Sequence, residues 1–247
     1  PQVGMPSVKE MNKLLIIKAG STFTATARKY GDFEDMIRRG SGLMRECVEV
    51  VDAVRSRQLP APDSCCGAII TGAHCMVTDN LDWSLAIEAW IRSMVTAAVP
   101  LLGVCYGHQL LGRAMGGRVG DHPQGKEVGT FDIRLRPEAR KDPIFSALPA
   151  QFAVHTTHSQ SVLALPPGAV LLAENDFEPH HAFRLGSCTW GVQFHPEYDS
   201  RVMRDYILAQ ADSLADSGRD SDALLQAVRE TPMANSILQK FVSLVSA

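Results

Sequence analysis

The chain has 247 residues, of which 45% are hydrophobic and 21% charged, and a formal net charge of −3 at pH 7. This length fits one α/β domain with a well-buried core, and the composition excludes a disordered chain. Without a basic excess, nucleic acid is not expected as a partner, and no apolar run reaches the length of a membrane span. Six irregularly spaced cysteines predict reduced thiols and a cytoplasmic protein. No metal-ligand spacing, phosphate loop or dinucleotide fingerprint occurs, so we expect no metal or cofactor.

Strand-like and helix-like segments alternate along the chain, as is typical of α/β proteins. We expect strands at 14–18, 68–71, 99–104, 131–135, 169–173 and 192–194. Helix-compatible sequence covers 34–39, 43–55, 83–97 and 107–115, and amphipathic or helix-like stretches follow at 201–214, 222–229 and 233–245. These patterns predict residues 1–10 as a leader of uncertain relevance, 11–200 as the main domain, and 201–247 as a helical extension packed on that domain.

Cys105 lies where the apolar strand 99–104 gives way to a helix-compatible stretch. Gly103 and Gly107 flank it in a Gly-x-Cys-x-Gly arrangement, and residues without a Cβ relieve the crowding at a sharp strand-to-helix turn. The thiol would then project from the carboxyl edge of the sheet, close to the amino end of the next helix, which favours the thiolate. We therefore expect a nucleophile elbow at Cys105, and the alternative is a buried structural cysteine at a strand end.

A base and its orienting group occur together near the far end of the sequence. Pro196 cannot extend a ladder, so the strand at 192–194 is expected to end with His195 at the carboxyl edge of the sheet. If both strands belong to one parallel sheet, His195 lies at the same edge as Cys105. His195 could then accept the thiol proton, while Glu197 holds the other ring nitrogen and selects the tautomer.

The segments Gly103-Val-Cys105-Tyr-Gly107-His-Gln109 and Gln193-Phe-His195-Pro-Glu197 together resemble the class I (triad) glutamine amidotransferases. The chain looks most like stand-alone proteins related to the glutaminase domain of GMP synthase, from about Leu14 to Tyr198. This resemblance implies a three-layer α/β/α fold with a central, mostly parallel, flavodoxin-like sheet and added C-terminal helices. It also implies that Cys105 attacks the side-chain amide of glutamine to form a γ-glutamyl thioester. His195 would protonate the departing ammonia and then activate water.

A third segment, Ala68-Ile-Ile-Thr71-Gly72-Ala73-His74, stands where the family carries a Ser-Gly-Gly-Pro-like turn. The resemblance implies that the N–H groups of Ala73 and Tyr106 form the oxyanion hole and that Gly72 lies beside the substrate. A Cβ at residue 73 would resist a positive φ, should the turn require one. His74 either contacts the substrate or is a solvated loop residue.

A fourth segment, around His158, falls where the family has a Ser-His-Gly-Asp-like stretch that binds the α-amino and α-carboxylate groups of glutamine. The resemblance implies substrate contacts from His158, Ser159 and Gln160, and from Gln109, one helical turn beyond Cys105. Because Gln160 replaces an acid and can only accept a hydrogen bond from an ammonium, recognition of the head group is expected to differ from the family's.

Three functions remain open from the sequence. The chain is a glutaminase-type hydrolase or amidotransferase that acts on glutamine or another γ-glutamyl small molecule and passes ammonia to a separate synthetase subunit. Alternatively, it is a γ-glutamyl peptidase that uses water as the final acceptor. The third alternative is a non-enzymatic regulatory or redox-sensing protein that keeps a reactive Cys105. The paired base and orienter argue against the third function, because a binding module needs neither.

Overall fold

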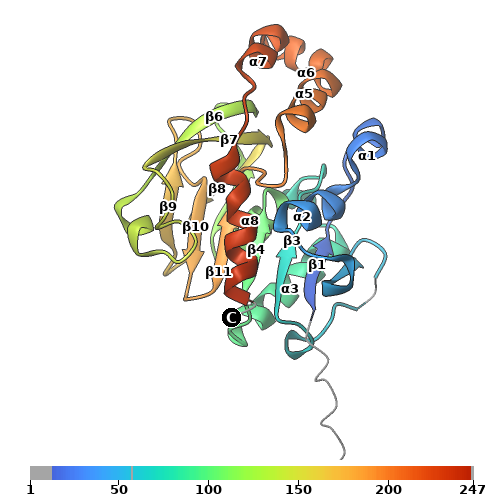
Figure 1. Ribbon diagram of the computed structural model, residues 1–247, viewed down its shortest axis with the longest axis vertical. Coiled ribbons are helices and arrows are strands. Elements are labelled where there is room, and N and C mark those ends of the chain that lie inside the picture. The colour runs from blue at the N-terminus through green and yellow to red at the C-terminus, as the bar shows by residue number, and fades with distance from the viewer. Residues whose placement is uncertain (1–12, 57, 246–247) are drawn as a thin grey trace, which may run out of the picture.

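The computed structural model describes residues 13–56 and 58–245, so the predicted leader at 1–10 lies outside the described residues. Its centre is a nine-stranded sheet in the order β2-β1-β3-β4-β11-β10-β9-β6-β7, and β5 and β8 form a second, two-stranded sheet (Figure 1). The strands are β1 (Leu14–Lys18), β2 (Val48–Asp52), β3 (Gly67–Ile70), β4 (Leu101–Val104), β5 (Arg118–Asp121), β6 (Glu127–Leu135), β7 (Gln151–His158), β8 (Gln160–Ala164), β9 (Val170–Glu174), β10 (Ala182–Leu185) and β11 (Thr189–Val192).

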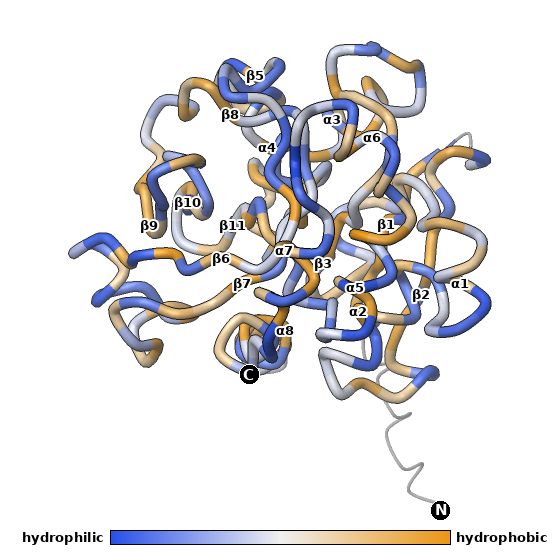
Figure 2. Tube along the Cα trace, turned by 90° about the horizontal axis from the view of Figure 1, so that it is seen from above, coloured by the Kyte–Doolittle hydropathy of each residue, from blue (hydrophilic) through white to orange (hydrophobic). Residues whose placement is uncertain are grey.

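Helices cover both faces of the large sheet. The helices of the described residues are α1 (Thr24–Tyr30), α2 (Phe33–Ser41), α3 (Asp82–Thr96), α4 (Tyr106–Ala114), α5 (Ser200–Ala209), α6 (Ala211–Asp216), α7 (Ser221–Ala227) and α8 (Pro232–Val245), with short 3-10 turns η1 (Arg45–Cys47), η2 (Pro62–Ser64), η3 (Val77–Asp79) and η4 (Pro137–Lys141). Seen from above, α3 and α4 lie on one side of the sheet and α2 and α8 on the other (Figure 2). This is the expected three-layer, flavodoxin-like α/β/α architecture.

A hydrophobic core lies on each face of the large sheet, because successive side chains of a strand point to opposite faces. In β1, Leu14 and Ile16 belong to the cluster that includes α2 and α8, whereas Leu15 and Ile17 belong to the cluster that includes α3 and α4. Because β1 is apolar on both faces, it reads in the sequence as a continuous hydrophobic run, as is typical of a parallel strand between two helical layers.

The topology brings the two sequence motifs to one edge. Strands β2, β1, β3, β4 and β11 pair in parallel, and the remaining strands of the large sheet pair antiparallel. Val104 of β4 pairs with Val192 of β11, so both strands end at the same level. The two strands thus belong to one parallel sheet, which is the condition under which the sequence places Cys105 and His195 at the same edge.

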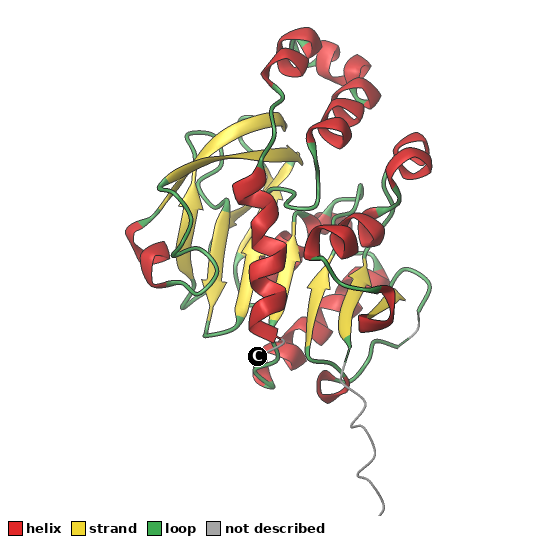
Figure 3. Cartoon of the chain, in the orientation of Figure 1, coloured by secondary structure: helices red, strands yellow, loops and turns green. Residues whose placement is uncertain are grey.

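Helices α5, α6 and α7 stand beyond the carboxyl ends of the parallel strands and are joined to the rest of the chain by two loops (Figures 1 and 3). We call this segment, residues 200–227, the helical cap. Asn235 in the first turns of α8 holds the chain just before the cap, because its Nδ2 donates to the carbonyl oxygens of Pro196 (2.7 Å) and Tyr198 (2.8 Å). The main chain thus leaves and re-enters the body of the protein at one place.

Three predicted elements were wrong in extent or type. Residues 43–55 form η1 and the edge strand β2 instead of a helix, because the β-branched Val48, Val50 and Val51 pair with β1. The strand before His195 spans Thr189–Val192 and not 192–194, so it begins and ends earlier than expected. The helix expected at 201–214 breaks at Gln210 into α5 and α6.

Candidate active site

Cys105 occupies a strained backbone position between β4 and α4. Its φ of 50° and ψ of −100° lie in a region that residues with a side chain rarely adopt. A Cβ at Gly103 would lie 2.4 Å from the carbonyl oxygen of Gly107, and a Cβ at Gly107 would lie 2.6 Å from that of Ile70. Both glycines are therefore required by close backbone contacts. The turn that the sequence predicts for a nucleophile elbow is present.

His195 and Glu197 form a buried pair. Nδ1 of His195 lies 2.7 Å from Oε1 of Glu197, and both side chains are almost inaccessible to solvent, at 2% and 0%. The ring of Tyr198 stacks on the imidazole with 4.1 Å between centroids and 9° between planes. The backbone N–H of His195 donates to the carbonyl oxygen of His155 on β7 (2.9 Å), which fixes the chain at this point.

The environment of His195 favours its charged form. Burial by itself would lower the pKa of the imidazole, but the Glu197 carboxylate and the Cys105 sulfur raise it to about 10. An imidazolium next to a cysteine stabilises the thiolate, which is the nucleophilic form. The pair therefore has the electrostatic properties of a cysteine and histidine that act together.

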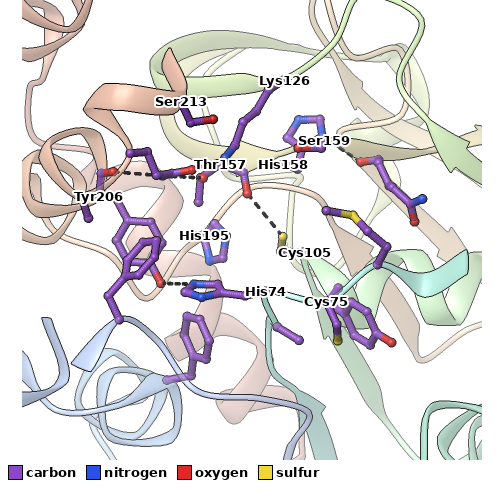
Figure 4. Close-up of a pocket in the computed structure, with 18 of the residues that line it drawn as sticks. His74, Cys75, Cys105, Lys126, Thr157, His158, Ser159, His195, Tyr206 and Ser213 are labelled. Atoms are coloured by element: carbon purple, nitrogen blue, oxygen red, sulfur yellow. Dashed lines mark hydrogen bonds between the residues drawn. The ribbon is translucent and has the colours of Figure 1, made fainter. Parts of the chain in front are cut away.

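Cys105 and His195 face the same small space. Both line one pocket of about 400 Å³ (Figure 4). A Cβ at Gly72 would lie 3.2 Å from Cε1 of His195 and 3.8 Å from Cβ of Cys105, so Gly72 sits against both residues. Nε2 of His195, the nitrogen not facing Glu197, is buried without a hydrogen-bond partner among the described residues. It is the atom available to exchange a proton in the pocket.

The turn that the resemblance assigns to the oxyanion hole follows β3. Thr71 orders it, because its hydroxyl accepts a hydrogen bond from the N–H of Ala19 (3.0 Å) and donates to the carbonyl of Gly72 (2.9 Å). Ala73 does not have a positive φ, so its Cβ is no obstacle to the turn. Ala73 and Tyr106 both line the pocket, and Tyr106 begins α4, where N–H groups lack partners within the helix.

The residues expected to hold the substrate head group line the pocket but already have protein partners. His158 is fully buried, with Nε2 2.9 Å from Oε2 of Glu127 and Nδ1 2.9 Å from the carbonyl oxygen of Gln160. The side-chain amide of Gln160 donates to Thr78 (2.7 Å) and to Asp121 (3.0 Å).

Gln109 is held in the same way, since its Nε2 donates to the carbonyl oxygen of Gln160 (2.7 Å) and to Oε1 of Gln193 (3.0 Å). Ser159 also lines the pocket. These contacts fix the shape of the wall beside Cys105 and occupy the donors of Gln109 and Gln160. The substrate contacts inferred from the sequence stay predictions.

Sequence reasoning missed the side of the pocket that faces the cap. Tyr206, Gln210 and Ser213 come from the cap, and Lys126 from the link between β5 and β6. His74 joins this side, because its Nε2 lies 3.2 Å from the hydroxyl of Tyr206. Burial, followed by the charge of His195, lowers the pKa of His74. Only the fold brings these residues to the pocket, and no local pattern in the sequence marks them.

Two further observations limit the kinds of site present. Within the described ranges, no group of three or more His, Cys, Asp or Glu side chains is arranged to hold a metal ion. Among those same residues, no helix is long and apolar enough to cross a membrane.

The fold and the pocket together define the class of protein. It is an α/β protein with a cysteine on a strained strand-to-helix turn, beside a buried histidine–glutamate pair. The chain belongs to the glutamine amidotransferase class-I family, whose sequence profile matches residues 33–212.

Named relatives include two kinds of enzyme. Gamma-glutamyl peptidase 5 of Arabidopsis thaliana is 30% identical over 57% of this chain and 57% of its own length. The glutamine-hydrolysing GMP synthase of Porphyromonas gingivalis is 35% identical over 53% of this chain but only 24% of its own length. The chain thus matches about half of the peptidase and a quarter of the synthase.

Solved structures agree on the fold. A glutamine amidotransferase from Thermotoga maritima superposes with a TM-score of 0.75 at 20% identity, covering 95% of this chain and 98% of its own. A glutamine amidotransferase from Methylobacillus flagellatus gives a TM-score of 0.74 at 24% identity, covering 96% and 93%. Likeness at this level of identity supports the architecture alone.

Proposed function

We propose that this chain hydrolyses the amide bond of a γ-glutamyl substrate through a covalent thioester on Cys105. The observation that carries the proposal is the arrangement of the pocket. A cysteine on a strained elbow opens into the same space as the unpartnered Nε2 of His195, whose Nδ1 is held by Glu197. A structural cysteine needs neither the strain nor the neighbouring imidazole.

The reaction follows from these contacts. The Cys105 sulfur attacks the side-chain carbonyl carbon of the substrate, and the imidazolium of His195 gives its proton to the departing nitrogen. The C–N bond breaks, which leaves a γ-glutamyl thioester and releases ammonia or an amine. His195, now neutral, removes a proton from water, the hydroxide attacks the thioester, and glutamate leaves as Cys105 is restored.

Backbone N–H groups stabilise the negative charge that develops on the carbonyl oxygen of the substrate. Ala73 and Tyr106 line the same pocket as Cys105, and their backbone amides are the proposed donors. Donors of this kind contribute about 3–4 kcal/mol each to the stability of the transition state. Gly72, pressed against both Cys105 and His195, keeps this turn close to the reacting atoms.

The leaving group separates two versions of the function. Glutamine as substrate would make the chain an amidotransferase that delivers ammonia to a synthetase on a separate polypeptide. A γ-glutamyl peptide as substrate would make it a peptidase. The second version is supported by the likeness to a gamma-glutamyl peptidase and by a pocket of about 400 Å³ that extends from Cys105 to the cap. Six free cysteines are in keeping with a cytoplasmic location for either.

The test measures both products on both substrate classes. The purified protein is incubated with glutamine and with a panel of γ-glutamyl peptides, and released ammonia and glutamate are quantified, with Cys105→Ala as the control. Turnover that the Cys105→Ala variant lacks supports the proposal, and the preferred substrate decides between the versions. If no γ-glutamyl amide is hydrolysed and Cys105→Ser leaves the biological activity unchanged, a non-enzymatic role replaces the proposal.

A further inference from the structure

Lys126 places a positive charge in the wall of the active-site pocket. It lies in the link between β5 and β6, and its side chain extends into the pocket opposite Cys105 (Figure 4). No other lysine or arginine among the described residues lines this pocket. The chemistry of the reaction gives Lys126 no role, so its presence requires a separate reason.

The ammonium group is held in position by neutral neighbours. Nζ of Lys126 donates to Oε1 of Gln210 at the junction of α5 and α6. Nε2 of Gln210 lies 3.3 Å from the hydroxyl of Thr157. The carbonyl oxygen of Thr157 in turn accepts a hydrogen bond from the Cys105 thiol, with 3.8 Å between sulfur and oxygen. Three contacts therefore connect Lys126 to the proposed nucleophile. An anion bound by Lys126 would lie in the same pocket as the bond that is cleaved.

The charge of Lys126 is not neutralised by the protein. In the part of the chain that the structure describes, no carboxylate forms an ion pair with it. Asp212 lines the same pocket without pairing with it. Burial lowers the pKa of the Lys126 ammonium. A half-buried cation without a counter-ion is unfavourable, and a bound anion would offset that cost.

The side chains of His158 and Gln160 are already engaged. Glu127 holds His158, and Thr78 and Asp121 hold the side chain of Gln160. His158 and Gln160, two residues that the resemblance assigns to the substrate head group, thus have partners within the protein. Among the described lysines and arginines, Lys126 alone lines this pocket, where its charge is available to a ligand.

We propose that Lys126, positioned by Gln210 of the cap, binds a carboxylate of the substrate. This inference rests on the proposed function, because it assumes a γ-glutamyl compound in the pocket. Such a compound offers two carboxylates of the same chemistry. One is the α-carboxylate of the γ-glutamyl group, and the other is the carboxylate of the amino acid that leaves from a γ-glutamyl peptide.

The first experiment compares KM values of the wild type and Lys126→Gln. The substrates are glutamine, its analogue without the α-carboxylate (4-aminobutanamide), γ-glutamylalanine and γ-glutamylalaninamide. Lys141→Gln removes an equal charge from an exposed lysine outside the pocket and serves as the matched control. A lost charge-assisted hydrogen bond is expected to raise KM by about 10- to 100-fold.

The pattern of change identifies the carboxylate. If Lys126 binds the α-carboxylate, KM rises for glutamine and both peptides but not for 4-aminobutanamide. If it binds the leaving residue, KM rises for γ-glutamylalanine and not for γ-glutamylalaninamide. A KM that is unchanged for every substrate, or raised equally for substrates with and without each carboxylate, overturns the inference.

A second experiment measures binding without turnover. Calorimetric titration of Cys105→Ala with the same four ligands is compared with the Cys105→Ala, Lys126→Gln double variant, after circular dichroism has shown that both are folded. Weaker binding of only the carboxylate-bearing ligands to the double variant supports the subsite even if the wild type hydrolyses none of them, which would refute the proposed function alone. Equal binding to both variants, or no binding of any carboxylate-bearing ligand to Cys105→Ala, overturns the subsite.

Discussion

Replacing Glu197 with glutamine tests whether this carboxylate sets the charge of the proposed base. The substitution keeps the shape of the side chain and an oxygen that can accept from Nδ1 of His195, but it removes the negative charge 2.7 Å from the ring. Burial alone would lower the pKa of His195, and Glu197 is the first of the groups that raise it to about 10. We expect the pKa of His195 to fall in Glu197→Gln.

The size of the effect follows from the burial of the pair. Both side chains are at most 2% exposed, so water screens their interaction weakly. Removing one partner of a buried ion pair costs about 3–5 kcal/mol. A loss of about 3 kcal/mol from the transition state corresponds to a rate about 150 times lower. Because glutamine still accepts a hydrogen bond, the lower end of this range is expected for kcat.

The assay follows the alkylation of Cys105 by iodoacetamide as a function of pH, since this rate needs no substrate. The other cysteines also react, so mass spectrometry of the peptide that contains Cys105 gives the rate for that residue alone. In the wild type, the imidazolium of His195 persists up to about pH 10, so the charge beside Cys105 is kept over this range. In Glu197→Gln, this charge is lost at a lower pH.

Glu138→Gln, a change at an exposed acid of η4, is the matched control and is expected to behave as the wild type. If the alkylation profile and kcat of Glu197→Gln coincide with those of the wild type, Glu197 does not control His195, and the proposed triad reduces to two residues.

Folding stability gives a second measure of the same pair. The pKa of His195 is raised from its unfolded value of 6.5 to about 10, so the protonated form is stabilised in the folded state. This contribution to the free energy of unfolding is complete below about pH 6.5 and is lost as the pH rises toward 10. Urea denaturation over this alkaline range should show a fall in stability that is smaller in Glu197→Gln.

The remaining predictions concern the elbow, the stacked ring and a buried histidine. Gly103→Ala should lower the free energy of unfolding, measured in urea, by at least the roughly 1–3 kcal/mol that is typical of overpacking, because its Cβ would lie 2.4 Å from the carbonyl oxygen of Gly107. A variant as stable as the wild type would contradict this contact. Tyr198→Leu removes the ring stacked 4.1 Å from His195 and should lower kcat about fivefold, for a loss of about 1 kcal/mol, whereas an unchanged kcat would show that stacking does not position the base. Burial lowers the pKa of His155 to about 4, so its neutral form contributes stability above about pH 6.5 that is lost as the pH falls toward 4. In His155→Gln, the free energy of unfolding should therefore depend less on pH over this range. The same pH dependence in the variant and the wild type would argue against this role.

The sequence predicted the parts of the site that depend on local geometry. The glycines around Cys105 indicate a crowded turn, and Pro196 indicates the end of a strand, because both residue types restrict the backbone in a known way. Since parallel strands end at a common edge, the two motifs could be placed together without any long-range contact being known. The second strand was expected at 192–194 but spans Thr189–Val192, because its extent depends on pairing with β4 and β10, which no local pattern shows.

The parts that could not be predicted depend on partners distant in the chain. Sequence comparison assigned His158 and Gln160 to substrate binding, but it could not show that Glu127 and Thr78 already hold their side chains. Lys126 carries no motif, and only the fold brings the link between β5 and β6 to the pocket. Residues 48–52 were likewise expected as helix but form a strand, because they pair with β1, a partner distant in the chain.

The hydrogen bonds from Asn235 to Pro196 and Tyr198 hold the two ends of the helical cap at one place. The chain departs just after Tyr198 and returns at α8, whose buried residues belong to the main core, so the positions of both ends are fixed by contacts outside the cap. The entropy cost of closing a loop grows slowly with its length, so a cap with more, fewer or different helices could be built between the same two points. The cap supplies Gln210 and Tyr206 to the pocket but neither Cys105 nor His195. If the proposed function holds, we expect changes in residues 200–227 to alter substrate range while Cys105 and His195 keep their positions.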